Sequence, residues 1–418
     1  MQPMERTLEQ WLDYQQQVHP RSIDMGLERV GEVARRLGLG RPARRVITVG
    51  GTNGKGSTVA FIEAIARAAG LKVGAYTSPH LLRYNERVRI DGADAGDAAL
   101  VAAFERIEAA RGETPLTYFE FGTLAALMLF EAAGLDLAVL EVGLGGRLDA
   151  TNIVDPDCAV ITTVDLDHQD YLGDDRESIG FEKAGILRAG KPCVLAEKDP
   201  PSSVLRHAYA IGAFAIRGYS DYLVDELDAG WRWREPGYEI DLPDPAMPAP
   251  AQRGNAAAAI AALRALDLPV PDQALREGVA TARAPGRLQV LPGSPEMVLD
   301  VAHNPQGARQ LADWLAANPK PTVAVFSALA DKDLAGICRP LAPWLRAWHL
   351  GPITDAGARG LAVDELARRL GDELPADILF AHRSLADARH AAATAAGKDG
   401  RVLVFGSFHT VAEALASA

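Results

Sequence analysis

The stretch that decides the fold is Val46–Ser57, which reads Val-Ile-Thr-Val-Gly-Gly-Thr-Asn-Gly-Lys-Gly-Ser. A short β-branched run ends in glycines, and an apolar segment, Thr58–Ala69, follows the final serine. This order predicts a strand, a glycine-rich turn and a helix. Glycines let backbone N–H groups approach a phosphate closely, and the helix N-terminus adds the positive end of its dipole.

The spacing of this loop differs from the common phosphate-binding pattern, Gly-x4-Gly-Lys-Ser/Thr, because Gly56 separates Lys55 from Ser57. A glycine turn that only begins a helix is the simpler alternative. The lysine, the hydroxyl and the strand–helix context together favour phosphate binding. We expect Lys55 to reach the terminal phosphates from an exposed loop, and Ser57 to lie near a Mg2+ ion.

Length and composition limit the class of protein. The chain has 418 residues and a formal net charge of -12, which predicts two domains and argues against a nucleic-acid-binding protein. Its three cysteines show no metal-ligand or disulfide pattern, and no apolar run is long enough to span a bilayer. Residues 1–20 do not resemble a signal peptide. We therefore expect a cytoplasmic protein without a membrane partner.

The rest of the chain alternates between strand-like and helix-like segments, which predicts an α/β fold. We expect an N-terminal, P-loop-type domain over residues 1–284, with a mostly parallel sheet flanked by helices. A smaller, Rossmann-like α/β domain is expected over residues 285–418, after a hinge at Ala284-Pro285-Gly286-Arg287. Residues 220–243 lose the alternation and predict small antiparallel strands.

Polar residues follow several of the predicted strands, where ligands collect in parallel sheets. Glu141 ends one strand and is a natural Mg2+ ligand beside a phosphate loop, although a capping or paired glutamate is the alternative. His168, flanked by carboxylates, is either a metal ligand or a structural histidine. Asp300 and His303 follow the first clear strand of the second domain, and Arg287 at the hinge is suited to bidentate phosphate contact.

Longer segments carry a family resemblance. The phosphate loop, and Asp300-Val301-Ala302-His303-Asn304-Pro305, resemble the ATP-dependent amide-bond ligases that include the Mur ligases. The closer resemblance is to the folylpolyglutamate synthase/dihydrofolate synthase family. It rests on Thr77–Leu81, Tyr84–Arg89, Thr117–Glu120, Leu140–Asn152, Asp167-His168, Glu182–Ile186 and Gly406–Thr410.

The resemblance implies a role for each matching residue. The nucleotide positions are Gly54, Lys55, Gly56, Ser57, Asn255, Arg287, Asp300 and His303. The Mg2+ ligands are Ser78, Glu141 and His168, and the catalytic residues are Lys55, Lys183 and His168. Lys183 matches a lysine that carries a carbamate in this family. The segments that line the pteroate pocket are Pro20, Arg21, Ser22, Thr117, Tyr118, Phe119, Glu120, Leu148, Asp149 and Ala150.

The resemblance also implies an activity. We expect an ATP-dependent ligase that joins L-glutamate to 7,8-dihydropteroate and adds further glutamates to reduced folates, through an acyl phosphate, as a monomer. In the pteroate pocket, Phe119 is expected to offer an aromatic face and Asp149 a carboxylate for ring N–H groups.

Several alternatives compete with this expectation. A folate-only polyglutamate synthase and a cell-wall Mur ligase share the chemistry. A GTPase-type switch needs Asn/Thr-Lys-x-Asp, which Asp331-Lys332-Asp333 does not match. A dinucleotide site at Gly143–Gly146 is disfavoured, because Leu148 takes the place of the third glycine.

Overall fold

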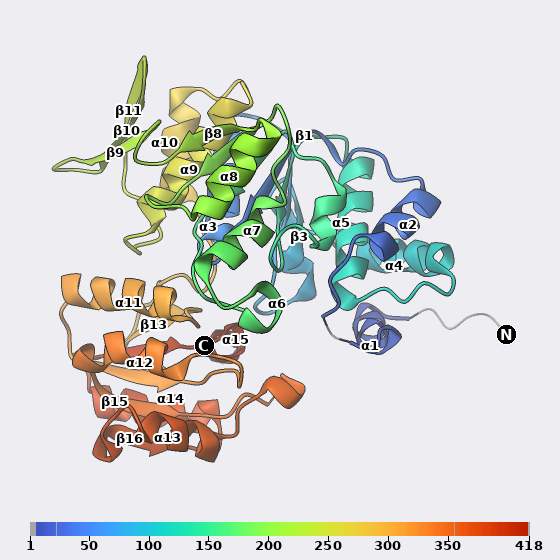
Figure 1. The fold of residues 1–418 in the computed structure, drawn as a ribbon. Coiled ribbons are helices and arrows are strands. Elements are labelled where there is room, and N and C mark those ends of the chain that lie inside the picture. Colours follow the sequence, from blue (N-terminus) through green and yellow to red (C-terminus); the bar gives the residue numbers. More distant parts are fainter. Residues whose placement is uncertain (1–5, 22, 355, 417–418) are drawn as a thin grey trace.

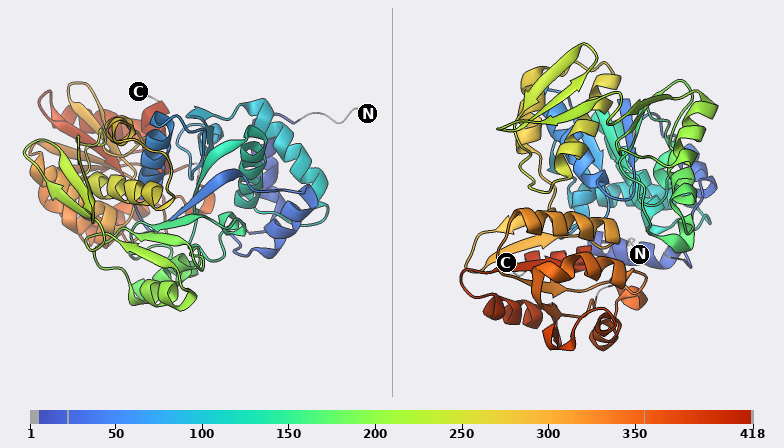
Figure 2. Two further views of the ribbon diagram at one scale, coloured as in Figure 1. Left: turned by 90° about the horizontal axis from the view of Figure 1, so that it is seen from above. Right: turned by 60° about the vertical axis from the view of Figure 1, so that its left-hand side comes forward.

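The structure is a computed structural model that describes residues 6–21, 23–354 and 356–416. The chain forms two α/β bodies that face each other (Figure 1), and the two rotated views show the same division (Figure 2). The larger body contains the N-terminal part of the chain, and the smaller one, coloured orange to red, begins near residue 288.

The larger body is built on an eight-stranded sheet with the order β4-β3-β2-β5-β1-β6-β7-β8. Six strands run parallel, and β3 and β4 extend one edge antiparallel. The strands are β1 (Ala43–Gly50), β2 (Val73–Tyr76), β3 (Val88–Ile90), β4 (Ala93–Asp94), β5 (Leu135–Glu141), β6 (Cys158–Ile161), β7 (Pro192–Leu195) and β8 (Phe214–Arg217).

Helices cover both faces of this sheet, which explains why its central strands carry apolar residues on both faces. In β5, Leu137 and Val139 face one hydrophobic core, whereas Ala138 and Leu140 face another. The first core lies under α3 (Lys55–Ala68), α9 (Gln252–Ala265) and α10 (Asp272–Thr281). The opposite face carries α1 (Leu8–Val18), α2 (Glu28–Leu37), α4 (Asp97–Arg111), α5 (Tyr118–Ala133), α7 (Arg176–Ala184) and α8 (Ser202–Ile211).

A small antiparallel sheet of β9 (Leu223–Glu226), β10 (Trp231–Glu235) and β11 (Tyr238–Leu242) packs onto α9. Trp231 and Trp233 are fully buried in the core that contains α3 and α9. The Trp233 indole donates a hydrogen bond to the carbonyl of Ala257 in α9 (3.2 Å). The antiparallel strands predicted within residues 220–243 are therefore present, and they close one side of the first core.

The smaller body has a six-stranded sheet with the order β12-β13-β17-β14-β15-β16, in which β12 alone is antiparallel. The strands are β12 (Gln289–Leu291), β13 (Glu296–Asp300), β14 (Thr322–Phe326), β15 (Leu345–Leu350), β16 (Leu379–Ala381) and β17 (Arg401–Phe405). One face carries α11 (Pro305–Ala317), α12 (Leu334–Leu341) and α13 (Val363–Gly371), and the other α14 (Leu385–Ala396) and α15 (Phe408–Ala416).

The predicted fold class is confirmed. Predictions from the sequence did not include the helices α6 (Gln169–Leu172), α8, α10 and α15, the edge strands β4, β8 and β12, or β3 beside β4. Edge strands lack the continuous apolar run of the central strands: in β8, Phe214 is exposed. Among the described residues, no helix combines the length and the apolar character that crossing a bilayer requires.

Candidate active site

The phosphate loop joins β1 to α3 in a conformation that requires glycine. Gly51 has φ 146°, and a Cβ there would lie 1.9 Å from Thr162 Oγ1. Gly54 has φ 88° and occupies the N-cap of α3, where no side chain caps the helix. The first N–H groups of this 14-residue helix are therefore left for another acceptor, and the helix dipole favours an anionic one.

Lys55 is the first residue of α3 and is half-buried, so the expectation that it lies in an exposed loop is wrong. The glycine turn folds back over its side chain, and its ammonium donates hydrogen bonds to the carbonyls of Gly51 (3.0 Å) and Thr52 (3.2 Å). Burial lowers the pKa of Lys55, while the nearby Glu141 carboxylate opposes that shift. The side chain thus lies inside the loop that it is predicted to serve.

Two of the predicted metal ligands lie together at the ends of neighbouring strands. Glu141 is the last residue of β5 and is buried, and its Oε2 accepts a hydrogen bond from the backbone N–H of Ser78 (3.2 Å). Burial raises the pKa of Glu141, although Lys55 and Arg287 draw it down. Because Oε1 accepts no hydrogen bond from the described residues, this carboxylate retains an oxygen for a cation.

His168, the third predicted ligand, is held by its backbone in the left-handed region (φ 51°) at the start of the short helix α6 (Gln169–Leu172). Burial lowers the pKa of His168 to about 4, so the imidazole is neutral near pH 7 and keeps a lone pair for a metal. The preceding residue, Asp167, accepts a hydrogen bond from the backbone N–H of His168 (2.9 Å). That bond fixes the turn that directs His168 into the cavity.

Asp167 also connects the two domains. The Lys332 ammonium lies 2.6 Å from its Oδ1, and Oδ2 lies 3.4 Å from His303 Nε2 and accepts a hydrogen bond from Asn304 (3.1 Å). Burial opposes ionisation, but these contacts outweigh it and hold the pKa of Asp167 well below its usual range. Arg309 adds an ion pair to Asp165 (2.6 Å).

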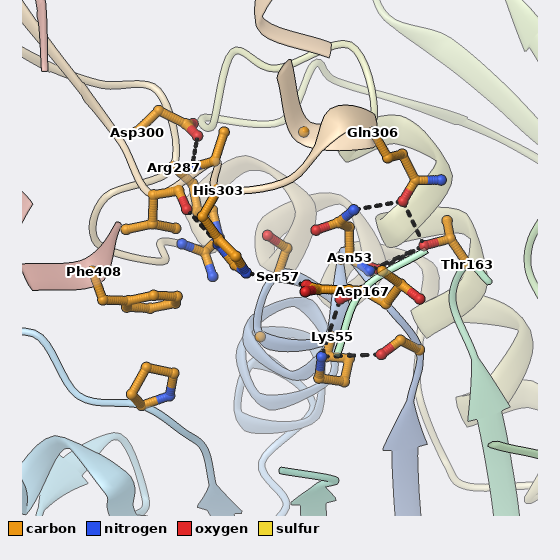
Figure 3. Close-up of a pocket in the computed structure, with 18 of the residues that line it drawn as sticks. Asn53, Lys55, Ser57, Thr163, Asp167, Arg287, Asp300, His303, Gln306 and Phe408 are labelled. Atoms are coloured by element: carbon orange, nitrogen blue, oxygen red, sulfur yellow. Dashed lines mark hydrogen bonds and ion pairs between the residues drawn. The ribbon is translucent and has the colours of Figure 1, made fainter. Parts of the chain in front are cut away.

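An amide network runs beside these ion pairs (Figure 3). The side chains of Asn53 and Asn304 exchange two hydrogen bonds of 3.0 Å. Gln306 accepts hydrogen bonds from Asn53 (2.6 Å) and from the Thr163 hydroxyl (3.0 Å). The phosphate loop is therefore bonded directly to the first turn of α11, which belongs to the second domain.

Arg287, Asp300 and His303 approach the cavity from the second domain, as Figure 3 shows. Both oxygens of Asp300 accept backbone N–H groups, from Leu288 and Ala302 (2.8 Å each), so this carboxylate also holds the chain at the hinge. The Arg287 guanidinium lies over the ring of Phe408 (5.2 Å).

Lys183 lies in the last turn of α7 and is buried. Burial, together with the charge of Lys55, lowers its pKa to about 7. The described residues offer its ammonium no hydrogen bond and no ion pair. A substantial fraction of this side chain is therefore an uncharged, nucleophilic amine at neutral pH.

The two domains enclose a cavity of about 430 Å3. All the predicted nucleotide, metal and catalytic residues line it: Gly54, Lys55, Gly56, Ser57, Ser78, Glu141, His168, Lys183, Asn255, Arg287, Asp300 and His303. The Gln252 amide donates a hydrogen bond to the Ser57 hydroxyl (3.3 Å) and accepts one from Asn255 (3.0 Å).

The predicted pteroate segments meet one another beside this cavity but do not line it. Phe119 packs against Gly143, a cavity residue, where a Cβ would lie 2.7 Å from its ring. Gly26 reaches the same region, since its N–H donates to the Leu148 carbonyl (3.2 Å). Pro20 and Arg21 are exposed, and Ser22 lies outside the described residues.

Two carboxylates in these segments, those of Asp149 and Glu120, already bind other groups of the protein. Asp149 accepts four hydrogen bonds, from the backbone of Gly143, Leu144 and Thr151 and from the Thr151 hydroxyl. Glu120 caps α5 through Thr117 and pairs with Arg29 (3.2 Å). Recognition of ring N–H groups by Asp149 therefore requires some of its present bonds to break.

Sequence analysis missed several cavity residues from the second domain, among them Gln306, Lys332 and Arg359. The position of Gln306 in the first turn after a strand end is a signal that could have identified it. Lys332 enters the sequence interpretation only through the comparison with the GTPase-type Asn/Thr-Lys-x-Asp pattern. Its pairing with Asp167, 165 positions away, leaves no signal in one sequence.

The donor set is consistent with Mg2+ held largely by nucleotide phosphates. Among the described residues, no group of three or more histidine, cysteine or carboxylate side chains is arranged so that it could hold a metal ion by itself. One carboxylate, one imidazole and one hydroxyl are too few to bind the ion alone. Mg2+ usually keeps several waters and bridges substrate phosphates, so a sparse set beside a phosphate loop fits it.

Comparisons with known proteins agree with this geometry. Residues 49–211 match the model of the Mur ligase middle domain, and residues 286–408 that of the Mur ligase glutamate ligase domain. The fold and the site thus define a Mur-type ligase.

Full-length relatives narrow the class. The dihydrofolate synthase/folylpolyglutamate synthase of Escherichia coli (strain K12) is 47% identical over 411 residues, which cover 98% of this chain and 94% of the relative. A structure of E. coli FolC in complex with DHPP and ADP superposes with a TM-score of 0.94 at 46% identity, covering 99% of this chain and 98% of that one. A structure of a bifunctional folylpolyglutamate synthase/dihydrofolate synthase with Mn, AMPPNP and L-glutamate bound superposes with a TM-score of 0.92 at 45% identity, covering 100% of this chain and 99% of that one. The chain belongs to the dihydrofolate synthase/folylpolyglutamate synthase family.

Proposed function

We propose that this protein is an ATP-dependent ligase that joins L-glutamate to 7,8-dihydropteroate and also adds glutamates to reduced folates. The observation that carries the proposal is the cavity between the domains. It combines an uncapped helix N-terminus, a lysine inside a glycine loop and a buried carboxylate with a free oxygen. Family membership supports both the reaction and the substrates.

Condensing a carboxylate with an amine in water is unfavourable, because carboxylate oxygen is a poor leaving group. In the proposed reaction, a substrate carboxylate oxygen attacks the γ-phosphorus of ATP, and ADP leaves. The N–H groups of α3 and the Lys55 ammonium hold the phosphates while the substrate carboxylate approaches the γ-phosphate. Ser78, Glu141 and His168 would hold a Mg2+ ion, which would supply positive charge to neutralise the phosphates.

In the second step, the amine of glutamate attacks the acyl carbonyl and phosphate leaves. Water must be excluded, since it hydrolyses the acyl phosphate. We place the domain boundary between residues 284 and 285 and assign closure to rotation about this hinge. Contacts between Asp167 and Lys332, and between Asn53 and Asn304, stabilise the closed arrangement.

We further propose that Lys183 carries a carbamate. Its uncharged amine, favoured by burial, adds to CO2 and releases one proton, which turns a neutral amine into an anionic oxygen group. That group faces the cavity that holds Lys55 and positions the metal and the phosphates.

The pterin is assigned to the segments around Phe119, beside Gly143 and next to the reacting centre. Each glutamate already attached moves the pterin further from the reacting carboxylate. Because dihydropteroate carries no glutamate, its pterin must bind this close to the metal site. We also propose that the protein acts as a monomer in the cytoplasm.

The test is a product assay with purified protein, ATP, Mg2+ and glutamate. Dihydrofolate is expected to form from dihydropteroate, and Phe119→Ala is expected to reduce that rate more than it reduces tetrahydrofolate extension. Phe214→Ala, which removes an exposed ring on β8, is the matched control and should change neither rate. If the protein extends folates but does not convert dihydropteroate, the proposal is wrong and the protein is a folate-only polyglutamate synthase.

A further inference from the structure

Arg87 is a buried cation for which the described residues provide no counter-ion. It precedes β3, its side chain is about nine-tenths buried, and its backbone carbonyl accepts a hydrogen bond from the Thr77 N–H (2.9 Å). Within the described part of the chain, its one side-chain hydrogen bond is from Nε to His80 Nδ1 (2.8 Å). A largely buried guanidinium without an anion is unfavourable unless its remaining nitrogens reach water or a ligand.

The neighbouring charges do not neutralise it. His80 accepts its hydrogen bond through a ring nitrogen and supplies no negative charge. Both oxygens of Glu86 are bonded to backbone N–H groups of residues 81–83. Arg89, two residues further on, differs from Arg87 in having a counter-ion, because it forms an ion pair with Glu63 (2.8 Å).

The surroundings of Arg87 are aromatic. The rings of Tyr84 and Tyr118 lie 5.4 Å from its guanidinium carbon. The buried Tyr84 hydroxyl packs against Gly122, where a Cβ would lie 2.6 Å from that oxygen. The terminal nitrogens of Arg87 have no hydrogen-bond partner among the described residues, and they are not sealed from solvent. Arg87 therefore has free donors that a ligand can reach.

This place lies between the cavity and the segments assigned to the pteroate. Ser78 and Pro79, on the loop that leads to His80, line the cavity. On the other side, Tyr118 is followed by Phe119, which packs against the cavity residue Gly143. A ligand that extends from the reacting centre towards Phe119 therefore passes close to Arg87.

We propose that the terminal nitrogens of Arg87 bind the α-carboxylate of a glutamate already attached to the substrate. This inference rests on the proposed function and makes Arg87 a specificity residue for folates. Dihydropteroate and dihydrofolate differ by that glutamate. The first presents one carboxylate, which reacts, whereas the second presents a reacting γ-carboxylate and an additional α-carboxylate.

The experiment compares the binding of these two ligands by calorimetry, with Mg2+ and a non-hydrolysable ATP analogue present. Arg87→Gln is expected to weaken dihydrofolate binding at least tenfold, the value of one charge-assisted hydrogen bond, and dihydropteroate binding less than threefold. Arg83→Gln is the matched control, since Arg83 is exposed on the same loop and pairs with Asp97 (3.1 Å). It is expected to change neither affinity.

Stability separates binding from a structural role. Because Arg87→Met removes an uncompensated charge, the ligand-free Tm is expected to stay the same or rise, while the Tm increase caused by dihydrofolate is lost. A lower ligand-free Tm together with equal weakening of both ligands overturns the proposal, and so does an unchanged dihydrofolate affinity. Wild-type protein that binds both ligands but turns over neither contradicts the proposed function alone.

Discussion

Lys183 provides the sharpest test of the site, because its burial has a calculable cost. Burial lowers its pKa to about 7, roughly 3.5 below the ordinary lysine value of 10.5. At 1.36 kcal/mol per unit, the charged form destabilises the folded ligand-free protein by about 5 kcal/mol. The side chain is 3% exposed, so solvent screens little of this penalty.

The penalty depends on pH in a defined direction. The folded-state pKa is lower than the unfolded value, so the unfolded chain binds more protons between pH 7 and pH 10.5. Wild-type stability therefore rises with pH across that window, and the penalty is fully present below about pH 7. Lys183→Met, similar in volume and uncharged, is expected to raise the free energy of unfolding by several kcal/mol at pH 6, with no gain left near pH 10.5.

The assay is urea unfolding in bicarbonate-free buffer, following the transition of the larger domain. A gain of 3 kcal/mol shifts its midpoint by about 1 M if the slope is near 3 kcal/mol/M. Lys398→Met, which removes an exposed lysine, is the control and should show no pH-dependent gain. An unchanged or lower midpoint for Lys183→Met at pH 6 refutes the reasoning. In wild-type protein, labelled bicarbonate is expected to give a carbamate NMR signal that the variant lacks.

Two further predictions concern the nucleotide. Lys55→Ala is expected to keep a cooperative melt and lose at least 100-fold in turnover, because it removes charge where phosphates meet; near-normal activity contradicts the phosphate-loop assignment. Asp300→Ala is expected to raise the KM for ATP at least tenfold, and to lower the Tm because two backbone N–H groups lose their acceptor, while dihydropteroate affinity stays within threefold. An unchanged KM for ATP means that the second domain does not hold nucleotide through this residue.

Local sequence determined much of the fold. The continuous apolar run of β5 predicts a strand buried on both faces, and Leu137 and Ala138 do face opposite cores. The loop before α3 can be recognised in the sequence by its glycines. Glycine is needed there because Gly51 and Gly54 have positive φ and because a Cβ at either position would be too close to a neighbouring side chain. Residues at strand ends were found because parallel strands direct them to one edge.

Other features depend on tertiary contacts that leave no local pattern. Lys332 pairs with Asp167 across 165 positions, and Asn53 with Asn304 across 251. The low pKa of Lys183 comes from burial beneath other segments, which its own helix does not encode. Asp149 looked like a ligand carboxylate in the sequence, yet folding surrounds it with four donors. The sequence by itself therefore determined which groups are available, and the tertiary structure decided which remain free, because burial and pairing depend on segments brought together only by folding.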